Sequence, residues 1–107
     1  MIRRARLTLV DLAGSEKWDV RASAPRIEGT HARELTSINR SLSALGNCIA
    51  ALSEGRRHIP YRDSPLTRLL RDSLGGNCRT VVLATISPAA SSAEETASTL
   101  HFADRAR

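Results

Sequence analysis

A single stripe of apolar side chains runs through the middle of the sequence and constrains the fold more than any other feature. Its members recur at alternating steps of three and four residues and are Leu35, Ile38, Leu42, Leu45, Ile49 and Leu52. This spacing places them on one face of an α-helix of about five turns. Thr30 is a suitable N-cap and Gly55 a suitable C-cap. The stripe is too short for a coiled coil, so we expect a helix that packs on a sheet.

Two short apolar runs, residues 7–10 and residues 81–86, predict the strands of that sheet. The first is Leu-Thr-Leu-Val and the second is Val-Val-Leu-Ala-Thr-Ile, and the second is followed by Ser87-Pro88, which is typical of a strand exit. The stretch 17–29, which separates the first run from the long helix, has mixed charge and no periodicity. It therefore predicts a loop.

Two further helices are indicated by their start signals. Ser64 can cap a helix and Pro65 suits its first position, while the glycine pair that begins at Gly75 would end it. Its inward-facing side chains are expected to be Leu66, Leu69, Leu70 and Leu74. The sequence Ser-Ala-Glu-Glu at residues 92–95 predicts a capping box that opens a third helix running to the terminus. The packing positions of that helix are expected to be Leu100, Ala103, and Ala106 or Phe102.

The predicted order of elements is β-α-α-β-α. Strands separated by helices indicate an α/β fold with parallel strands. Two strands make a poor sheet, and a unit of this kind is marginal by itself. We therefore expect a chain of 107 residues that forms at most one domain and has no self-sufficient core.

The stretch Asp11-Leu12-Ala13-Gly14-Ser15-Glu16 follows the first predicted strand and is the best candidate for chemistry. A carboxylate at the end of a buried strand can hold Mg²⁺ through water, and a glycine backbone can approach a phosphate closely. This arrangement suits phosphoryl transfer, in which the protein mainly positions groups and neutralises charge. Taken alone, an apolar strand followed by Asp-x-x-Gly is more often an ordinary exit from a strand to a loop.

The charge balance favours an acidic partner. The net charge is +5, and six Arg face only two Asp between residues 56 and 79. Either a solvated helix face or a docking surface for an acidic partner would explain this concentration of Arg. Nucleic acid is not expected as the partner, because the chain has no reading helix, zinc-ligand spacing or aromatic platform.

Other sequence features bear on the cellular setting. No apolar run approaches the roughly 20 residues that cross a membrane, so no membrane partner is expected. Cys48 and Cys78 lie far apart without metal-ligand spacing. They are expected to be free thiols in a reducing compartment, which makes a cytosolic protein the default.

Five segments in order resemble the C-terminal third of a kinesin motor domain. Their sequences are DLAGSE at residues 11–16, SINRSLSALGN at 37–47, HIPYRDS at 58–64, LTRLLRDSLGGN at 66–77 and ETASTLHFA at 95–103. The spacing also matches, and the resemblance covers almost the whole chain. It implies that residues 1–107 are a partial kinesin motor domain. The fold would be a partial P-loop NTPase fold that lacks the strand bearing the P-loop.

The resemblance implies two sets of site residues. In the second nucleotide switch, Asp11 would hold Mg²⁺ through water, the Gly14 amide would sense the γ-phosphate of ATP, and Glu16 would pair with an Arg of the first switch. The helix from about Thr30 would be the relay helix that lies against the microtubule. The side chains expected to meet acidic tubulin are His58, Arg62, Arg68 and Arg71.

The sequence also departs from the kinesin pattern. Pro65 stands where most kinesins carry Lys, which removes one positive contact with tubulin. Residues 17–29 do not follow the usual Thr-Gly-Ala-rich loop. Neither a Gly-x-x-x-x-Gly-Lys-Ser/Thr phosphate cradle nor a Ser-Ser-Arg first switch occurs in these 107 residues. We therefore expect the chain by itself to be inactive as an ATPase.

The sequence leaves two hypotheses for function. In the first, the chain is part of an ATP-dependent, kinesin-like microtubule motor and carries its second switch and its microtubule-binding elements. Such a chain would be cytoplasmic and located on the microtubule cytoskeleton, and the rest of a motor domain would be its second partner. The alternative is a non-catalytic tubulin-binding remnant without ATPase activity.

Overall fold

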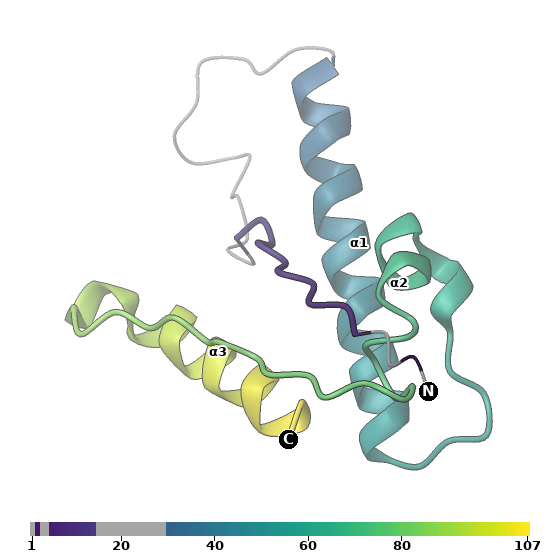
Figure 1. Ribbon diagram of the computed structural model, residues 1–107. Coiled ribbons are helices and arrows are strands. Elements are labelled where there is room, and N and C mark those ends of the chain that lie inside the picture. The colour runs from purple at the N-terminus through teal and green to yellow at the C-terminus, as the bar shows by residue number, and fades with distance from the viewer. Residues whose placement is uncertain (1, 3–4, 15–29) are drawn as a thin grey trace.

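Three α-helices and two short 3₁₀ turns make up the regular structure of the described residues in the computed structural model (Figure 1). The structure describes residue 2, residues 5–14 and residues 30–107. In chain order the elements are α1 (Thr30–Ser53), η1 (Tyr61–Asp63), α2 (Pro65–Leu69), η2 (Ala90–Ser92) and α3 (Ala93–Arg105). Glu16 and the predicted loop at 17–29 lie outside the described residues.

Helix α1 ends where the sequence predicts, and Thr30, the predicted N-cap, is its first helical residue. It runs from Thr30 to Ser53, and Gly55 follows in the left-handed conformation with a φ of 63°. The Arg56 amide donates to the Ala51 carbonyl at 2.9 Å, and the Gly55 amide donates to the Leu52 carbonyl at 3.1 Å. These two bonds form a Schellman motif, which satisfies carbonyls at the helix end.

Among the stripe side chains whose burial the structure describes, only those in the second half of α1 are buried. Leu45 and Ile49 are 3% and 6% exposed, whereas Ile38, two turns earlier, is 39% exposed. Leu45, Ile49 and Leu70 form the apolar core, and the side chains packed against it are Leu66, Leu74, Phe102 and Ala106. The core therefore joins the second half of α1 to α2, the turn after α2 and the end of α3.

Helix α2 starts as predicted but is shorter than predicted. Ser64 is its N-cap and Pro65 its first residue, yet the helix ends at Leu69. Leu69 is 81% exposed, so the prediction that it faces inward is wrong. Because α2 packs on α1 along one side, Leu66 and Leu70, which are four residues apart, occupy the contact row and Leu69 lies outside it.

The capping box predicted for α3 is not formed. Ser92 is the N-cap residue, but its side chain makes no capping hydrogen bond, and its φ and ψ of −102° and 14° are not extended. The η2 turn leads straight into α3, so the Ser92 hydroxyl is not presented to the first-turn amides as a cap would be. On α3, Phe102 and Ala106 pack against the core, whereas Leu100 is 51% exposed and is not a packing residue.

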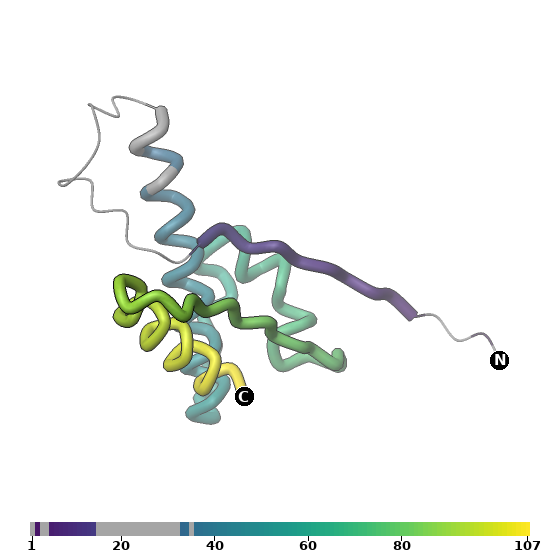
Figure 2. The backbone as a smooth tube through the Cα atoms, turned by 90° about the vertical axis from the view of Figure 1, so that its left-hand side faces the viewer, coloured from purple at the N-terminus to yellow at the C-terminus, as the bar shows by residue number. Residues whose placement is uncertain are grey.

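Neither of the two predicted strands is a strand in the part of the chain that the structure describes. Residues 7–10 and 81–86 are extended runs without ladder pairing (Figure 2). Leu7, Leu9 and Leu83 are 85%, 87% and 89% exposed. A strand forms only when a neighbouring backbone pairs with it, and neither run has such a neighbour among the described residues. Of the predicted order β-α-α-β-α, the described residues therefore form the three helices and neither strand.

Candidate functional site

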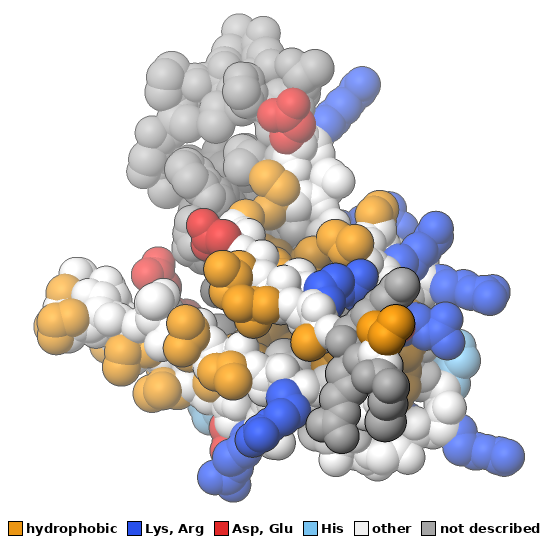
Figure 3. All heavy atoms as spheres, viewed as in Figure 1, with side chains coloured by type: hydrophobic (Ala, Val, Ile, Leu, Met, Phe, Trp, Pro, Cys, Tyr) orange, Lys and Arg blue, Asp and Glu red, His pale blue; other side chains and the backbone are white. Residues whose placement is uncertain are grey.

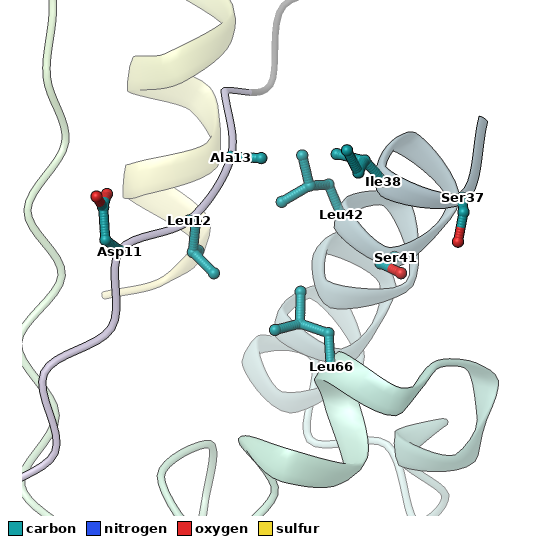
Figure 4. Close-up of a pocket in the computed structure, with 8 residues that line it drawn as sticks. All are labelled: Asp11, Leu12, Ala13, Ser37, Ile38, Ser41, Leu42 and Leu66. Carbon is teal, nitrogen blue, oxygen red and sulfur yellow. The ribbon is translucent and has the colours of Figure 1, made fainter. Parts of the chain in front are cut away.

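The segment around Asp11 lies beside the middle of α1 and encloses a hollow of about 280 Å³ with it. The hollow is lined by Asp11, Leu12, Ala13, Ser37, Ile38, Ser41, Leu42 and Leu66. Leu12 and Ala13 point toward α1, whereas the Asp11 carboxylate points away from the α1 side chains (Figure 4). The hollow is therefore lined mainly by apolar side chains, which come from the Asp11 segment, α1 and α2.

Asp11 and Gly14 are both exposed, and both follow the extended run at 7–10. The described residues contain no group of three or more side chains that could enclose a metal ion. Mg²⁺ keeps several waters and usually takes one or two carboxylates together with phosphate oxygens. One exposed carboxylate fits that donor set as a contact made through water. Among the predicted switch residues, the structure thus places Asp11 and Gly14 together, and Glu16 lies outside the described residues.

The four side chains predicted to meet tubulin are all exposed. They are His58, Arg62, Arg68 and Arg71, and we call them the basic surface. Figure 3 shows Arg and His side chains gathered on the right-hand side of the view, on the side of the molecule where α2 lies. Arg56 is paired with Glu54 at 2.6 Å, but within residues 30–107 no ion pair neutralises the basic surface. Its positive charge is therefore available to an acidic partner.

Three polar side chains fasten the turn at 59–64 onto α2, and we call Tyr61, Ser64 and Thr67 the polar clasp. The Thr67 amide donates to the Ser64 hydroxyl at 3.1 Å, and the Ser64 amide donates to the Thr67 hydroxyl at 3.2 Å. The Thr67 hydroxyl also lies 2.8 Å from the Tyr61 carbonyl, to which it can donate. The Tyr61 hydroxyl donates to the Leu74 carbonyl, beyond the end of α2. The turn is thus tied to both ends of the segment that carries Arg68 and Arg71.

The polar clasp is the part of the site that sequence reasoning missed. The predicted cap used Ser64 alone, whereas the structure shows a reciprocal capping box in which Thr67 takes the third helical position. The usual signature has Glu or Gln there. The spacing Ser-x-x-Thr, together with Pro65 at the helix start, was the available signal.

Comparisons with known proteins point to one family. The sequence profile described as the kinesin motor domain matches residues 1–107. The chain belongs to the kinesin motor domain family. It is 55% identical to kinesin-like protein KIN-8A of Arabidopsis thaliana and 54% identical to kinesin-like protein KIF18B of Mus musculus, over 98% and 99% of its length. It is 56% identical to kinesin-like protein KIF19 of Xenopus laevis over 99% of its length.

Membership in the kinesin family confirms the predicted resemblance and gives the fold class. Kinesin motor domains have a P-loop NTPase fold and make up a family of microtubule motors. This kinesin chain spans only 14%, 13% and 10% of the lengths of the three relatives. In the part that the structure describes, no helix is long and apolar enough to cross a bilayer.

Proposed function

We propose that this chain supplies the microtubule-binding surface and the second nucleotide switch of an ATP-dependent kinesin motor. The observation that carries the proposal is the basic surface, whose four side chains are exposed and lack acidic partners among residues 30–107. Tubulin presents an acidic surface, and opposite charges accelerate encounter and fix register. The proposal makes the motor cytoplasmic and associates it with the microtubule cytoskeleton.

On the nucleotide side, the proposal assigns a water-mediated Mg²⁺ contact to Asp11, γ-phosphate sensing to the Gly14 amide and an Arg pair to Glu16. Bound Mg²⁺ would neutralise charge that develops on the phosphates of ATP. The exposure of Asp11 and Gly14 supports these roles, since both groups can be reached by a ligand. Residues 1–107 would then be a partial motor domain, and the phosphate cradle and first switch would come from the rest of a motor.

The proposed fold completes the predicted β-α-α-β-α order. Residues 7–10 and 81–86 would become strands when they pair within the sheet of a motor domain. Their exposed apolar side chains support this, because such runs gain most from being covered. The sheet would also fix the Asp11 segment at the end of the first strand.

The packing suggests how the two sites would communicate. Leu42 of α1 and Leu66 of α2 line the same hollow as the segment that holds Asp11. Leu66 also packs against the core beneath the basic surface. A displacement of residues 11–14 would therefore alter the hollow that α1 and α2 side chains also line, which offers a route from the Asp11 segment to the two helices.

Co-sedimentation with microtubules at several salt concentrations tests the docking surface. Replacing both Arg62 and Arg68 by Glu should weaken binding by about tenfold or more, because the new carboxylates would repel the acidic surface of tubulin. The matched control replaces Arg105 and Arg107 by Glu, which changes the net charge equally at the end of α3. Equal weakening by both pairs would indicate unspecific cationic adhesion, and no change with either pair would refute the docking surface.

The alternative function is a non-catalytic tubulin-binding module. It is favoured by the position of the Asp11 carboxylate, which points away from the hollow instead of into it. Microtubule binding of this chain together with the rest of a motor domain should be compared with ATP, ADP and no nucleotide, each in the presence of Mg²⁺. Binding that is the same in all three conditions supports the alternative, and binding that depends on nucleotide supports the switch.

A further inference from the structure

The Thr67 hydroxyl is the centre of the polar clasp, although no partner could touch it. Thr67 is 0% exposed, and Ser64 is 4% exposed. The Thr67 hydroxyl accepts a hydrogen bond from the Ser64 amide at 3.2 Å. It also lies 2.8 Å from the Tyr61 carbonyl oxygen and 2.9 Å from the Ser64 carbonyl oxygen. One side-chain oxygen thus holds both the residue before Arg62 and the cap of α2.

The residues of the basic surface depend on this arrangement for their relative positions. Arg62 lies in the η1 turn, between the two residues that Thr67 holds. Arg68 follows Thr67 directly, and its Nη2 donates to the Arg62 carbonyl at 3.3 Å. The Arg71 guanidinium lies 5.7 Å from the centre of the Tyr61 ring, which is within range of a cation–π interaction.

The apolar core and the polar clasp hold different parts of this region. Leu66 and Leu70 attach α2 to α1 through apolar contacts that do not involve the Thr67 hydroxyl. The turn at 61–63 contributes no buried side chain. Loss of the hydroxyl should therefore loosen the turn around Arg62, which would keep only the Tyr61 bond to Leu74, the Arg68 bond and its contacts with α1, while α2 stays packed on α1.

We propose that Thr67 is a positioning residue, whose hydroxyl fixes Arg62 relative to Arg68 and so sets the geometry with which the basic surface meets an acidic protein partner. This inference rests on the proposed function, because it assumes that the basic surface docks on tubulin. It extends that function to a residue that makes no contact with the partner.

The test compares Thr67→Val with Thr67→Ser in microtubule co-sedimentation. Valine keeps the volume and removes the hydroxyl, and it leaves the Ser64 amide and the Tyr61 carbonyl without their partner. The Kd should rise by about tenfold, in line with the loss of a buried hydrogen-bonding group. The salt dependence of binding should also become shallower, because fewer charges engage together. Serine keeps the hydroxyl and should retain the original Kd and salt dependence.

A control variant and a second background separate positioning from stability. Thr96→Val removes a similar hydroxyl on α3, which donates to the Ser87 carbonyl at 3.2 Å, and should leave the Kd unchanged. In an Arg62→Ala background, Thr67→Val should have little further effect, since both changes remove the same contact. Far-UV circular dichroism of each variant shows whether the helices persist.

Three results would overturn the inference. If Thr67→Val lowers only the maximal bound fraction and leaves the Kd and the salt dependence unchanged, the clasp has a structural role alone. If Thr67→Ser weakens binding as much as Thr67→Val, the methyl packing matters and the hydroxyl does not. If the unmutated chain fails to bind microtubules, the proposed function fails, and the inference fails with it.

Discussion

Residues 44–75 and the two extended runs, 7–10 and 81–86, show how differently apolar sequence can behave in one chain. The first region buries Leu45, Ile49 and Leu70 to within 8% of full coverage. In the runs, Leu9 and Leu83 remain 87% and 89% exposed. A helix satisfies its own backbone and needs a partner only for one face, whereas a strand needs a neighbour for its backbone as well. The difference is therefore one of available neighbours and not of hydrophobicity.

The largest effect expected from this comparison is on stability. Ile49→Ala should lower the free energy of unfolding by about 2–5 kcal/mol, because it leaves a cavity in the only cluster of buried apolar side chains among the described residues. Leu83→Ala should change it by less than about 0.5 kcal/mol, since that side chain is already solvated. Urea unfolding followed by far-UV circular dichroism measures both. A similar loss in the two variants would show that residues 81–86 are packed in solution.

The two glycines with positive φ offer a second test, which separates backbone strain from packing. Gly75 has a φ of 81°, and an added Cβ would lie 2.6 Å from Leu52 Cδ2 and 3.2 Å from the Tyr61 hydroxyl oxygen. Gly55 has a φ of 63°, and an added Cβ would meet nothing within 4 Å. Gly55→Ala should cost about 1 kcal/mol of stability from left-handed backbone strain alone. Gly75→Ala should cost more, about 2–3 kcal/mol, because overpacking adds to the strain.

The measurement for both glycine variants is again the urea midpoint. The Gly75 variant also perturbs Tyr61, so its microtubule affinity should fall, while that of Gly55→Ala should not. Equal losses of stability at the two positions would mean that the contact between the turn at Gly75 and α1 is not formed.

The helical region was predictable because its signals are local. The period of the α1 stripe, Gly55 as C-cap, and Ser64 with Pro65 at the start of α2 each act within a few residues, and the structure bears them out. The exposure of the basic surface also followed from charge. Which residues of α2 face inward was harder to predict, because that depends on where the helix lies on α1, as the exposed Leu69 shows.

The rest depends on contacts that are distant in sequence. The short apolar runs at 7–10 and 81–86 indicate a preference for extended backbone, and the backbone is extended, but pairing depends on a neighbour that no local pattern specifies. The Tyr61 part of the polar clasp was missed because the bond from its hydroxyl to the Leu74 carbonyl joins residues 13 apart, whereas the Ser64–Thr67 part is local and its signal was overlooked. The roles of Asp11, Gly14 and Glu16 come from the family resemblance and remain predictions.

The two helix starts allow a smaller contrast between a formed and an unformed cap. Ser64→Ala should lower the free energy of unfolding by about 1–2 kcal/mol, because the Thr67 amide loses its acceptor in a buried position. Ser92→Ala should have almost no effect, since the Ser92 side chain makes no capping bond. Thermal unfolding of the two variants decides this. A loss of about 1 kcal/mol for Ser92→Ala would mean that the predicted capping box forms in solution.

The two cysteines give the smallest expected effect and probe the same contrast chemically. Cys48 is buried in the helical region and Cys78 is exposed in the bend that precedes the extended run 81–86, and both are free thiols. Burial, and secondarily the Asp63 carboxylate, raises the pKa of the Cys48 thiol above its ordinary value of 9.0. A thiol reagent should therefore label Cys78 quickly and Cys48 only as the region unfolds, because the reacting thiolate is scarce and covered there.

The raised pKa of Cys48 also fixes the sign of a pH effect. Folding favours the neutral thiol, so its contribution to stability is complete below pH 9.0 and is lost as the pH rises through the raised pKa of the folded state. As the pH rises above 9.0, the original chain should lose slightly more stability than a Cys48→Ala variant does. Cys78→Ala, as the control, should follow the original chain. If all three chains show the same pH dependence, the Cys48 thiol is solvated, and the core beneath the basic surface is looser than its burial indicates.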